Sequence, residues 1–383
     1  MKKIFKYAML MVAACTMTMG FVSCSDDDDN NDGDVTAKEL ALSAVNKQFV
    51  EKTAIATYEQ LADDCEELQT LVEDMDSQDD LVKVCDQWKK ARQDWEWSEA
   101  FLFGAASGYS IDPHIDTWPF DVTVFNFYMG KFDLTQENDQ QVIDHSVATT
   151  QNFTGFHAME YVIFREGQPR QFDALTANEL YFVKSVAADL YLSACRLEAA
   201  WKGTDNVKEA RQQLLADEEL EPEDNFGEEM MNAGNAGSRW KSATEGAIQI
   251  ISGCQDIIGE VAEGKIGSAF HGDDTNYIES PHAYNSIQDF YDNIMSCKHA
   301  LYGGLSVSGS EPAAGSLMAY CATYCPTEAA AVKAALENAL EKINSMKRPF
   351  VLNYMDASAG VAIDALNTLD ETLDALKGKL ENQ

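Results

Sequence analysis

The sequence predicts an all-α protein, and two observations support this prediction. Apolar residues recur at helical spacing over long stretches, whereas no strand-like alternation persists along the chain. Only 8 prolines interrupt the 383 residues, and 45% of the residues are hydrophobic, which is ample for a buried core. A chain of this length forms either two domains of ordinary size or one large domain. The simplest architecture is two helical bundles packed side by side.

The beginning of the chain predicts a targeting segment followed by a tether. Three lysines precede an apolar run, which ends in a small-residue cleavage site with Cys24 as its last residue. This arrangement resembles a bacterial lipobox, so we expect removal of residues 1–23 and lipidation of Cys24; cleavage as an ordinary signal peptide is the alternative. Residues 24–35 are mostly acidic and polar, so they cannot bury apolar area and are expected to form a flexible tether.

An aspartate run, Asp26–Asp29, follows the predicted anchor. It resembles the surface-export signals of some Gram-negative lipoproteins. We therefore expect an outer-membrane lipoprotein, with exposure at the cell surface favoured by this run. No other stretch is long and apolar enough to span a membrane, so the lipid is the expected membrane contact.

The rest of the chain divides into helical stretches with two interruptions. Residues 105–119 contain glycines, prolines and aspartates, which predict an irregular loop of the kind that often carries function. Residues 217–225 are strongly acidic and hold Pro222, which indicates a boundary or an exposed excursion. We therefore expect an N-terminal bundle over 36–220 and a C-terminal bundle over 221–383. The predicted helices are 36–75, as one helix or a broken pair, 79–103, 156–164, 176–201, 226–261, 281–305, 326–346 and 358–380.

One polar stripe stands out on the predicted helix 79–103. Arg92, Glu96 and Glu99 recur at i, i+4 and i+7, so their side chains leave the same face. A stripe of this kind usually faces water, and we expect it to do so here.

Charge limits the classes of partner. The chain holds 64 acidic and 28 basic residues. Three of the lysines lie in residues 1–23, so the remainder carries a net charge near −39. Nucleic acids and anionic lipid surfaces are therefore unsuitable partners, whereas cations are attracted.

The cysteines do not describe a disulfide framework. Of the 9 cysteines, Cys15 lies in the signal and Cys24 is the predicted anchor. The remaining seven are an odd number at irregular spacings. Cys321 and Cys325 stand one helical turn apart and could bridge or bind metal, but burial as small core residues is the favoured interpretation.

A His-x-x-Glu motif lies in the middle of the chain. If residues 156–164 are helical, His157 and Glu160 leave one face within reach of one cation. The alternative is a hydrogen-bonded histidine beside a surface carboxylate. The neighbouring side chains are mostly apolar, and a buried carboxylate needs a partner, so the sequence favours a cation.

This motif, as Gly-x-His-x-x-Glu from Gly155, resembles that of the imelysin-like proteins. Further blocks resemble the same family in the same order and extend the likeness over about residues 85 to 305. These blocks are Trp88, Arg92, Trp95, Ser98-Glu99-Ala100-Phe101, Phe103-Gly104, Ile111 to Pro119, Gly264-Lys265-Ile266, Glu279-Ser280-Pro281, Asn285, Asp289, Asn293-Ile294, Tyr302 and Gly304.

The resemblance implies two four-helix-bundle-like halves whose shared motifs meet at their interface, where ligands can come from both halves. It implies a metal site at His157 and Glu160, with Glu99 as our first choice for a third ligand. Trp118 is interpreted as a packing wall, with a cation-π role as the alternative. The other implied ligand-binding residues are Asp112, Asp116, Trp118, Gly155, Ser280, Asn285, Asp289 and Asn293.

The chain departs from the family pattern after Ser280. His282 and Ala283 stand where an aromatic residue and a serine are expected. The hydroxyl contribution at 283 is lost, and His282 is either an added ligand or an exposed loop histidine.

Two classes of function follow from the resemblance. In the first, a non-catalytic lipoprotein binds a metal, iron first and zinc second, or an iron-bearing small ligand, for uptake together with an outer-membrane transporter. In the second, the protein is a metallopeptidase, the activity for which the family is named. A hydrolytic zinc site needs three protein ligands, an open position and a general base. The sequence lacks His-Glu-x-x-His, so we favour binding and leave enzymatic activity open.

Overall fold

The computed structural model describes residues 32–137, 141–144, 153–307, 309 and 311–382. The chain divides into two compact units, residues 1–37 and residues 38–383, and the packing described below is that of the second. The predicted signal, Cys24 and the aspartate run lie outside the described residues, while the first helix begins at Asp32, inside the predicted tether.

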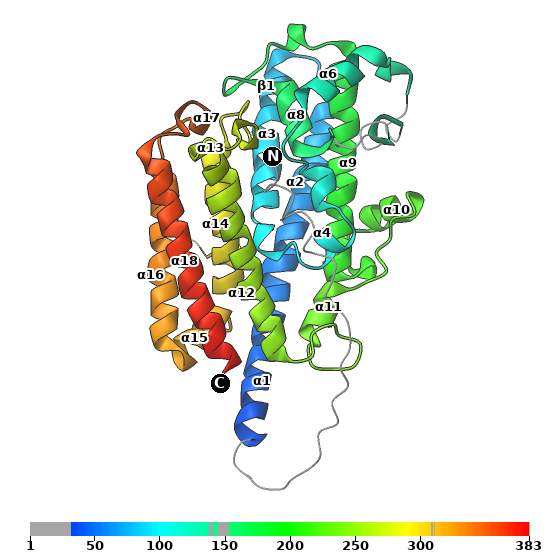
Figure 1. The fold of residues 1–383 in the computed structure, drawn as a ribbon. Helices are drawn as coiled ribbons and strands as arrows, with labels where there is room; N and C mark the ends of the chain where they lie inside the picture. Colours follow the sequence, from blue (N-terminus) through cyan, green and yellow to red (C-terminus); the bar gives the residue numbers. More distant parts are fainter. Residues whose placement is uncertain (1–31, 138–140, 145–152, 308, 310, 383) are drawn as a thin grey trace, which may run out of the picture. The chain divides into compact units, whose positions relative to one another are not determined.

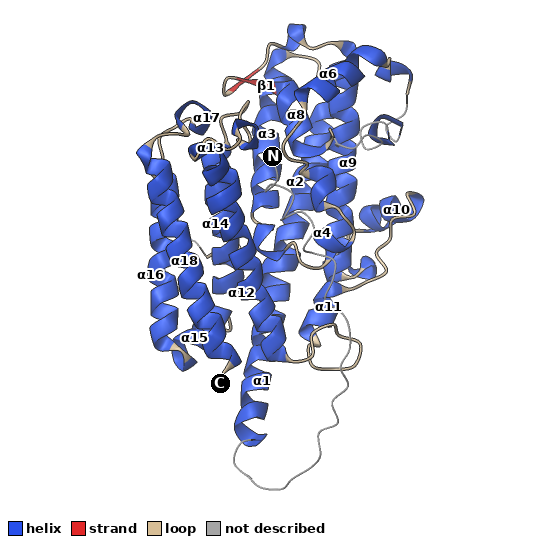
Figure 2. Ribbon diagram, in the orientation of Figure 1, coloured by secondary structure: helices blue, strands red, loops and turns tan. Residues whose placement is uncertain are grey.

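The prediction of an all-α fold is confirmed (Figure 2). Among the described residues, strands are limited to β1 (Phe164–Arg165) and β2 (Gln168–Pro169), which pair as a short antiparallel hairpin. No helix in this part of the chain combines the length and apolarity needed to cross a membrane.

The first set of packed helices contains α2 (Ile55–Glu73), α3 (Gln78–Glu96) and α9 (Ala177–Lys202). The predicted stretch 36–75 is helical as far as Glu73, since α1 (Asp32–Phe49) continues into α2 through a π-helical segment, η2 (Val50–Ala54). Side chains cap the other two helices: Ser77 accepts from the Asp80 N–H at α3, and Thr176 and Glu179 form a capping box at α9. Helix α2 packs against both α3 and α9 (Figure 1).

The second set contains α12 (Ala243–Gly259), α14 (Ser286–Tyr302), α16 (Pro326–Asn344) and α18 (Ala357–Glu381). These four helices run side by side, with α18 against α16 and α12, and α14 against α12 and α16 (Figure 1). Helix α14 also contacts α3 of the first set. One apolar core continues through both sets, and the division of the chain at residue 220 stays a prediction.

Shorter elements complete the fold. The predicted loop 105–119 holds two one-turn helices, and the predicted helix 226–261 is interrupted by a loop that a hydrogen bond from Gly234 N–H to Trp240 O closes at 2.9 Å. These elements are η3 (Glu99–Phe101), α4 (Ala105–Gly108), α5 (Asp112–Ile115), α6 (Val122–Lys131), η4 (Leu134–Gln136), α8 (Gly155–Ile163), η5 (Phe172–Ala174), η6 (Thr204–Asn206), α10 (Glu209–Asp217), α11 (Phe226–Met231), η7 (Glu260–Gly267), α13 (Ser268–Phe270), η8 (Thr275–Tyr277), α15 (Leu317–Tyr324) and α17 (Phe350–Asn353).

Two elements bring the sets together near the motif residues. The 3-10 turn η3, which carries Glu99, packs against α12 and α14. The π-helical segment η7 extends α12 and carries Lys265. The seven cysteines from Cys65 to Cys325 are buried and free, which confirms their interpretation as core residues.

Candidate metal-binding site

The polar stripe of α3 is buried, so the expectation that it faces water is wrong. Arg92 and Glu96 are 0% exposed, and Glu99 is 5% exposed. The reason is that α3 packs against α2 on one side and against α8 and α14 on others. Periodicity shows which side chains share a face, and here a second layer of helices covers that face too.

Arg92 is the centre of the buried charges. Its guanidinium forms ion pairs with Glu96, with Asp116 and, at 2.9 Å, with Glu279. Burial raises the pKa of Asp116, but Arg92 and then His157 lower it more, so the net pKa of this carboxyl is well below its usual range. Asp116 therefore stays ionised, and its second oxygen accepts a hydrogen bond from the Trp95 indole at 2.8 Å.

Helix α8 places His157 against Asp116, and Gly155 makes this possible. Gly155 has φ +77°, and a Cβ built on it would lie 2.0 Å from the carbonyl oxygen of Ile115. Only glycine allows this close approach. The imidazole Nε2 then lies 3.0 Å from Asp116 Oδ1 and 3.9 Å from Glu279 Oε1.

The His157 side chain is enclosed but lacks hydrogen bonds. It is 1% exposed, and the Trp118 ring lies against it at 4.4 Å between centroids. Neither ring nitrogen has a hydrogen bond of acceptable geometry with a described residue, although Nε2 is close to Asp116. Burial and Arg92 lower the pKa of His157, but Asp116 and Glu160 raise it more, and the net shift is upward.

Glu160 contacts His157 with one oxygen and the backbone with the other. Its Oε1 accepts the N–H groups of His282 and Ala283, both at 2.7 Å. Its Oε2 lies 3.7 Å from His157 Nδ1 and has no hydrogen bond among the described residues. Ala283 lacks the hydroxyl of the expected serine, but its backbone N–H binds Glu160. The two hydrogen bonds connect Glu160 to the loop before α14.

The second set of helices contributes one cation and several amides. Lys265 Nζ lies 3.0 Å from Glu279 Oε1 and donates to Asn293 Oδ1 at 3.2 Å. Asn293 in turn donates to Glu96. Ser280 and Asp289 are also buried, and the half-buried Asn285 donates to Asp289 at 2.6 Å.

A cavity of about 300 Å³ opens in front of these charges. Its walls include Asp112, Asp116, Trp118, Lys265 and Glu99. Burial and then Asp116 raise the pKa of Asp112 to about 7. Burial also raises the pKa of Glu99, where Lys265 opposes the shift and Asp112 adds to it. Trp118 also lines a smaller cavity, of about 160 Å³, which His157 and Glu160 share.

Three groups of side chains among the described residues could each hold a metal ion, with ligand atoms within 4.8 Å of one another. His157 falls in one group and Glu99 in another, whereas Glu160 falls in none. The shared shell of His157, Glu160 and Glu99 stays a prediction. Carboxylate oxygens with one imidazole suit iron, manganese or zinc, so the donors present fit a metal. The groups are Asp116, His157 and Glu279; Glu99, Asp112 and Asp116; and Glu96, Glu279 and Asp289.

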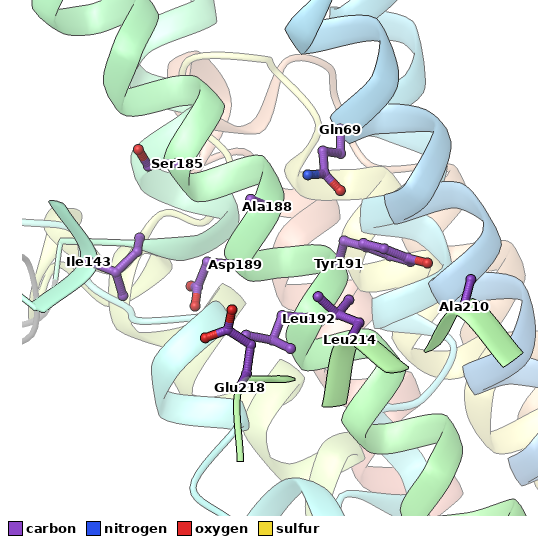
Figure 3. A pocket seen from close by; sticks show the side chains of 10 residues that line it. All are labelled: Gln69, Ile143, Ser185, Ala188, Asp189, Tyr191, Leu192, Ala210, Leu214 and Glu218. Carbon is purple, nitrogen blue, oxygen red and sulfur yellow. The ribbon is translucent and has the colours of Figure 1, made fainter. Parts of the chain in front are cut away.

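A larger cavity lies elsewhere, on α9. It has a volume of about 430 Å³, and Figure 3 shows Leu192 and Leu214 beside the carboxylates of Asp189 and Glu218. Asp189 is already paired with His114 at 2.9 Å, and none of the motif residues lines the cavity. We place the candidate site at the cavity of about 300 Å³ because several acids line it and one of them, Asp116, contacts His157.

Three contributors were not predicted as site residues. Glu279, Lys265 and Glu96 are central to the charge network, although Glu279 and Lys265 lie in blocks that resemble the family. The signal that could have found Glu96 is its i, i+4 spacing from Arg92, which places a carboxylate beside the guanidinium.

Fold and site together define an all-α protein with a buried histidine, an arginine and several carboxylates beneath a cavity. The sequence profile of the Imelysin family matches residues 54–376. The chain belongs to this family.

Known relatives agree with this assignment. Iron-regulated protein A of Synechococcus elongatus is 24% identical over 296 residues, which are 77% of this chain and 72% of that protein. The crystal structure of a putative iron-regulated protein A precursor from Parabacteroides distasonis matches with a TM-score of 0.76 at 25% identity, over 89% of this chain and 95% of that one. An imelysin-like protein from Psychrobacter arcticum has the same fold, with a TM-score of 0.59 at 16% identity over 92% of this chain and 95% of that one.

Proposed function

We propose that this protein is a non-catalytic lipoprotein of the cell envelope that binds a metal ion, iron in the first place, for uptake. The observation that carries the proposal is His157, whose buried Nε2 faces Asp116 Oδ1 at 3.0 Å and Glu279 Oε1 at 3.9 Å without a hydrogen bond of acceptable geometry to either. A buried polar group without such a bond is costly. A metal ion on Nε2 would give this nitrogen and the two carboxylates a common partner.

The residues that would hold the ion are His157, Asp116 and Glu279. Without a metal, the neighbouring carboxylates favour the protonated imidazole, whose pKa is raised on balance. Metal binding requires neutral imidazole and releases this proton. Arg92 fixes Asp116 and Glu279 in place, and Glu160 Oε2 orients the ring from the Nδ1 side at 3.7 Å.

The donor chemistry alone does not distinguish iron from manganese or zinc. The names of two relatives describe iron-regulated proteins, and this supports iron as the ion. An iron-bearing small ligand could reach the same residues through the cavity of about 300 Å³.

The envelope location rests on the sequence. Cys24 follows a small-residue cleavage site, and the acidic stretch after it separates an anchored lipid from the helices. We propose an outer-membrane transporter as the partner that receives the ion. Cys24→Ala should move the protein from the membrane fraction to the soluble fraction, and unchanged membrane retention would refute the anchor.

A metallopeptidase is the second candidate, and one observation favours it. Glu99 has a raised pKa beside a three-ligand group and faces the cavity, as a general base of a zinc hydrolase does. Against this, the sequence lacks the His-Glu-x-x-His motif of many zinc hydrolases. Cleavage of peptide substrates by zinc-loaded protein, abolished in Glu99→Gln, would establish the peptidase.

The deciding experiment is elemental analysis of the protein purified without oxygen and exposed to Fe²⁺. Wild type should retain iron, and His157→Ala should retain one equivalent less. His271→Ala is the matched control, because His271 is solvent-exposed and lies outside the three metal-capable groups. Wild type that retains no iron, or equal losses in the two variants, would refute the proposal.

A further inference from the structure

We infer that the cavity holds a second divalent cation, bound by Glu99, Asp112 and Asp116, so that Asp116 bridges two ions. This inference rests on the proposed function, which places the first ion at His157, Asp116 and Glu279. It deepens that proposal, because it assigns the site a stoichiometry of two and assigns separate ligands to the cavity-facing ion.

The strongest observation is the isolation of Glu99. Its side chain is almost completely buried, at 5% exposed, and it lines the cavity. Within the described part of the chain its carboxylate forms no hydrogen bond and no ion pair. A carboxylate with little access to water and no partner is costly when ionised. A cation in the cavity would remove that cost.

The backbone brings the other two carboxylates to the same place. Asp112 begins the one-turn helix α5, and Asp116 follows it, with the Asp116 N–H bonded to the Asp112 carbonyl at 3.0 Å. Residues four apart on a helical turn lie on one side. The 3-10 turn η3 carries Glu99, which lines the same cavity, and one ligand atom from each of the three residues lies within 4.8 Å of the others.

Arg92 and Lys265 form their ion pairs with Glu96, Asp116 and Glu279. Arg92 pairs with Glu96, Asp116 and Glu279. Lys265 Nζ is 3.0 Å from Glu279 and 3.8 Å from Glu96. Neither cation forms an ion pair with Glu99 or Asp112, so among the described residues these two cavity-facing carboxyl groups have no cation as partner.

Asp116 has the geometry of a bridge. Its Oδ1 faces Arg92 and His157, and its Oδ2 accepts from the Trp95 indole at 2.8 Å. Each carboxylate oxygen has two lone-pair sites, so both oxygens keep acceptor capacity. One ion can lie on the His157 side and another on the Glu99 side.

The chemistry selects small, hard cations for the second position. Three carboxylates and no nitrogen ligand suit Fe²⁺ or Mn²⁺, and water in the cavity can complete the coordination. The first position has the imidazole and is enclosed by Trp118. The second opens to the cavity, so its ion should bind more weakly and exchange faster.

The test uses Mn²⁺ with the purified full chain, followed by equilibrium dialysis and electron paramagnetic resonance. Wild type should bind two equivalents. The six-line signal of isolated Mn²⁺ should appear during the first equivalent and broaden during the second, because two ions that share Asp116 couple magnetically. Two equivalents without broadening would contradict the bridge.

Glu99→Gln is the decisive variant, since it keeps the side-chain size and breaks no hydrogen bond. It should weaken the second binding event at least tenfold and leave the first unchanged. Glu260→Gln is the matched control: Glu260 lines the same cavity and the charge change is equal, but it lies outside the three metal-capable groups.

The outcomes separate this inference from the proposed function. One equivalent in wild type, unchanged by Glu99→Gln, would overturn the second site and keep the first. No bound Mn²⁺ or Fe²⁺ would overturn both. Equal weakening in Glu99→Gln and Glu260→Gln would show general attraction to an acidic cavity and overturn the assignment to Glu99. Circular dichroism of each variant verifies the fold.

Discussion

Two arginines with 0% exposure each hold three carboxylates, and the comparison between them identifies the site. Arg211 pairs with Asp63, with Glu66 at 3.1 Å and with Glu198 at 2.6 Å. Arg92 pairs with Glu96, Asp116 and Glu279. By the residues in direct contact, the two clusters look alike.

The difference lies in what surrounds each cluster. At Arg211, two lysines join the network: Lys202 lies 3.1 Å from Glu198, and Lys208 contacts Asp63. Burial raises the pKa of Asp63, but Lys208 and Arg211 lower it more, so it falls below its usual value. Every acid of that cluster has a cation, and a structural role accounts for it fully.

At Arg92 the acids outnumber the cations. Besides His157, Lys265 is the cation that the described residues add there, and three further acids, Glu99, Asp112 and Asp289, all have raised pKa values. A buried arginine with three carboxylates is therefore no sign of a site by itself. Excess acid that faces a cavity, next to a histidine without hydrogen bonds, distinguishes the cluster at Arg92.

The largest effect should follow from removing the two arginines. Arg92→Met leaves three buried acids with one lysine, and breaking a buried ion pair on one side costs about 3–5 kcal/mol. Arg211→Met should cost less, about 1–2 kcal/mol, because Asp63 and Glu66 are half exposed and the lysines remain. Urea denaturation measures both, and equal losses would contradict the comparison.

Gly155→Ala should disturb the Arg92 cluster alone. The added Cβ would meet the Ile115 carbonyl at 2.0 Å, so α8 must move and carry His157 away from Asp116. We expect a loss of about 2–3 kcal/mol of stability and weaker metal binding.

Gly130→Ala on α6 is the control for this substitution, since a Cβ there has nothing within 4 Å. It should be neutral or slightly stabilising, because alanine favours a helix over glycine. Metal affinity that survives Gly155→Ala would show that the contact between α8 and Ile115 does not position His157.

The sequence predicted the helices well and the site in part. Helical spacing identified α9, α16 and α18 within one or two residues, and it found the start of α3 but placed its end at 103 instead of Glu96. The motif identified His157. The burial of Arg92 could not be predicted, because the covering α14 lies almost two hundred residues further along the chain.

The contacts of Glu160 illustrate a second limit of prediction from the sequence. The i, i+3 spacing placed Glu160 beside His157, as the structure has it. The two N–H groups that occupy its other oxygen belong to a loop in which Ser280 and Tyr284 have positive φ. Serine and tyrosine rarely adopt a positive φ. The sequence therefore contained no indication of this loop conformation or of its contact with Glu160.

A smaller effect should separate the two clusters in the presence of metal. Ligand binding to the folded state stabilises it by about 2.7 kcal/mol at a concentration one hundred times Kd. Added Mn²⁺ should therefore raise the thermal unfolding midpoint of wild type. Glu99→Gln should reduce the rise, whereas Glu66→Gln, an equal change at the Arg211 cluster, should leave it intact; a reduced rise in Glu66→Gln would place metal at both clusters.

The smallest effect concerns Asp94, which tests whether a raised pKa alone marks a cation site. Asp94 is 1% exposed and accepts from Gln60 at 2.5 Å. Burial and then Asp64 raise its pKa from 3.8 to about 9. It faces no metal-capable group among the described residues. Because the pKa of Asp94 is higher in the folded protein than in the unfolded chain, the protonated Asp94 contributes to the stability of the fold, and this contribution is complete below about pH 4. That contribution is lost as the pH rises through about 9.

Asp94→Asn should remove this loss. The amide keeps an acceptor for Gln60 and offers an N–H toward Asp64, as the protonated acid does. Urea denaturation at about pH 6 and pH 7 should show wild type losing about 1.4 kcal/mol more than the variant across this interval. Parallel pH profiles would mean that Asp94 is ionised in the fold. Unchanged Mn²⁺ stoichiometry in Asp94→Asn would show that a raised pKa needs an open cavity and converging ligands, as at Glu99, before it indicates a cation site.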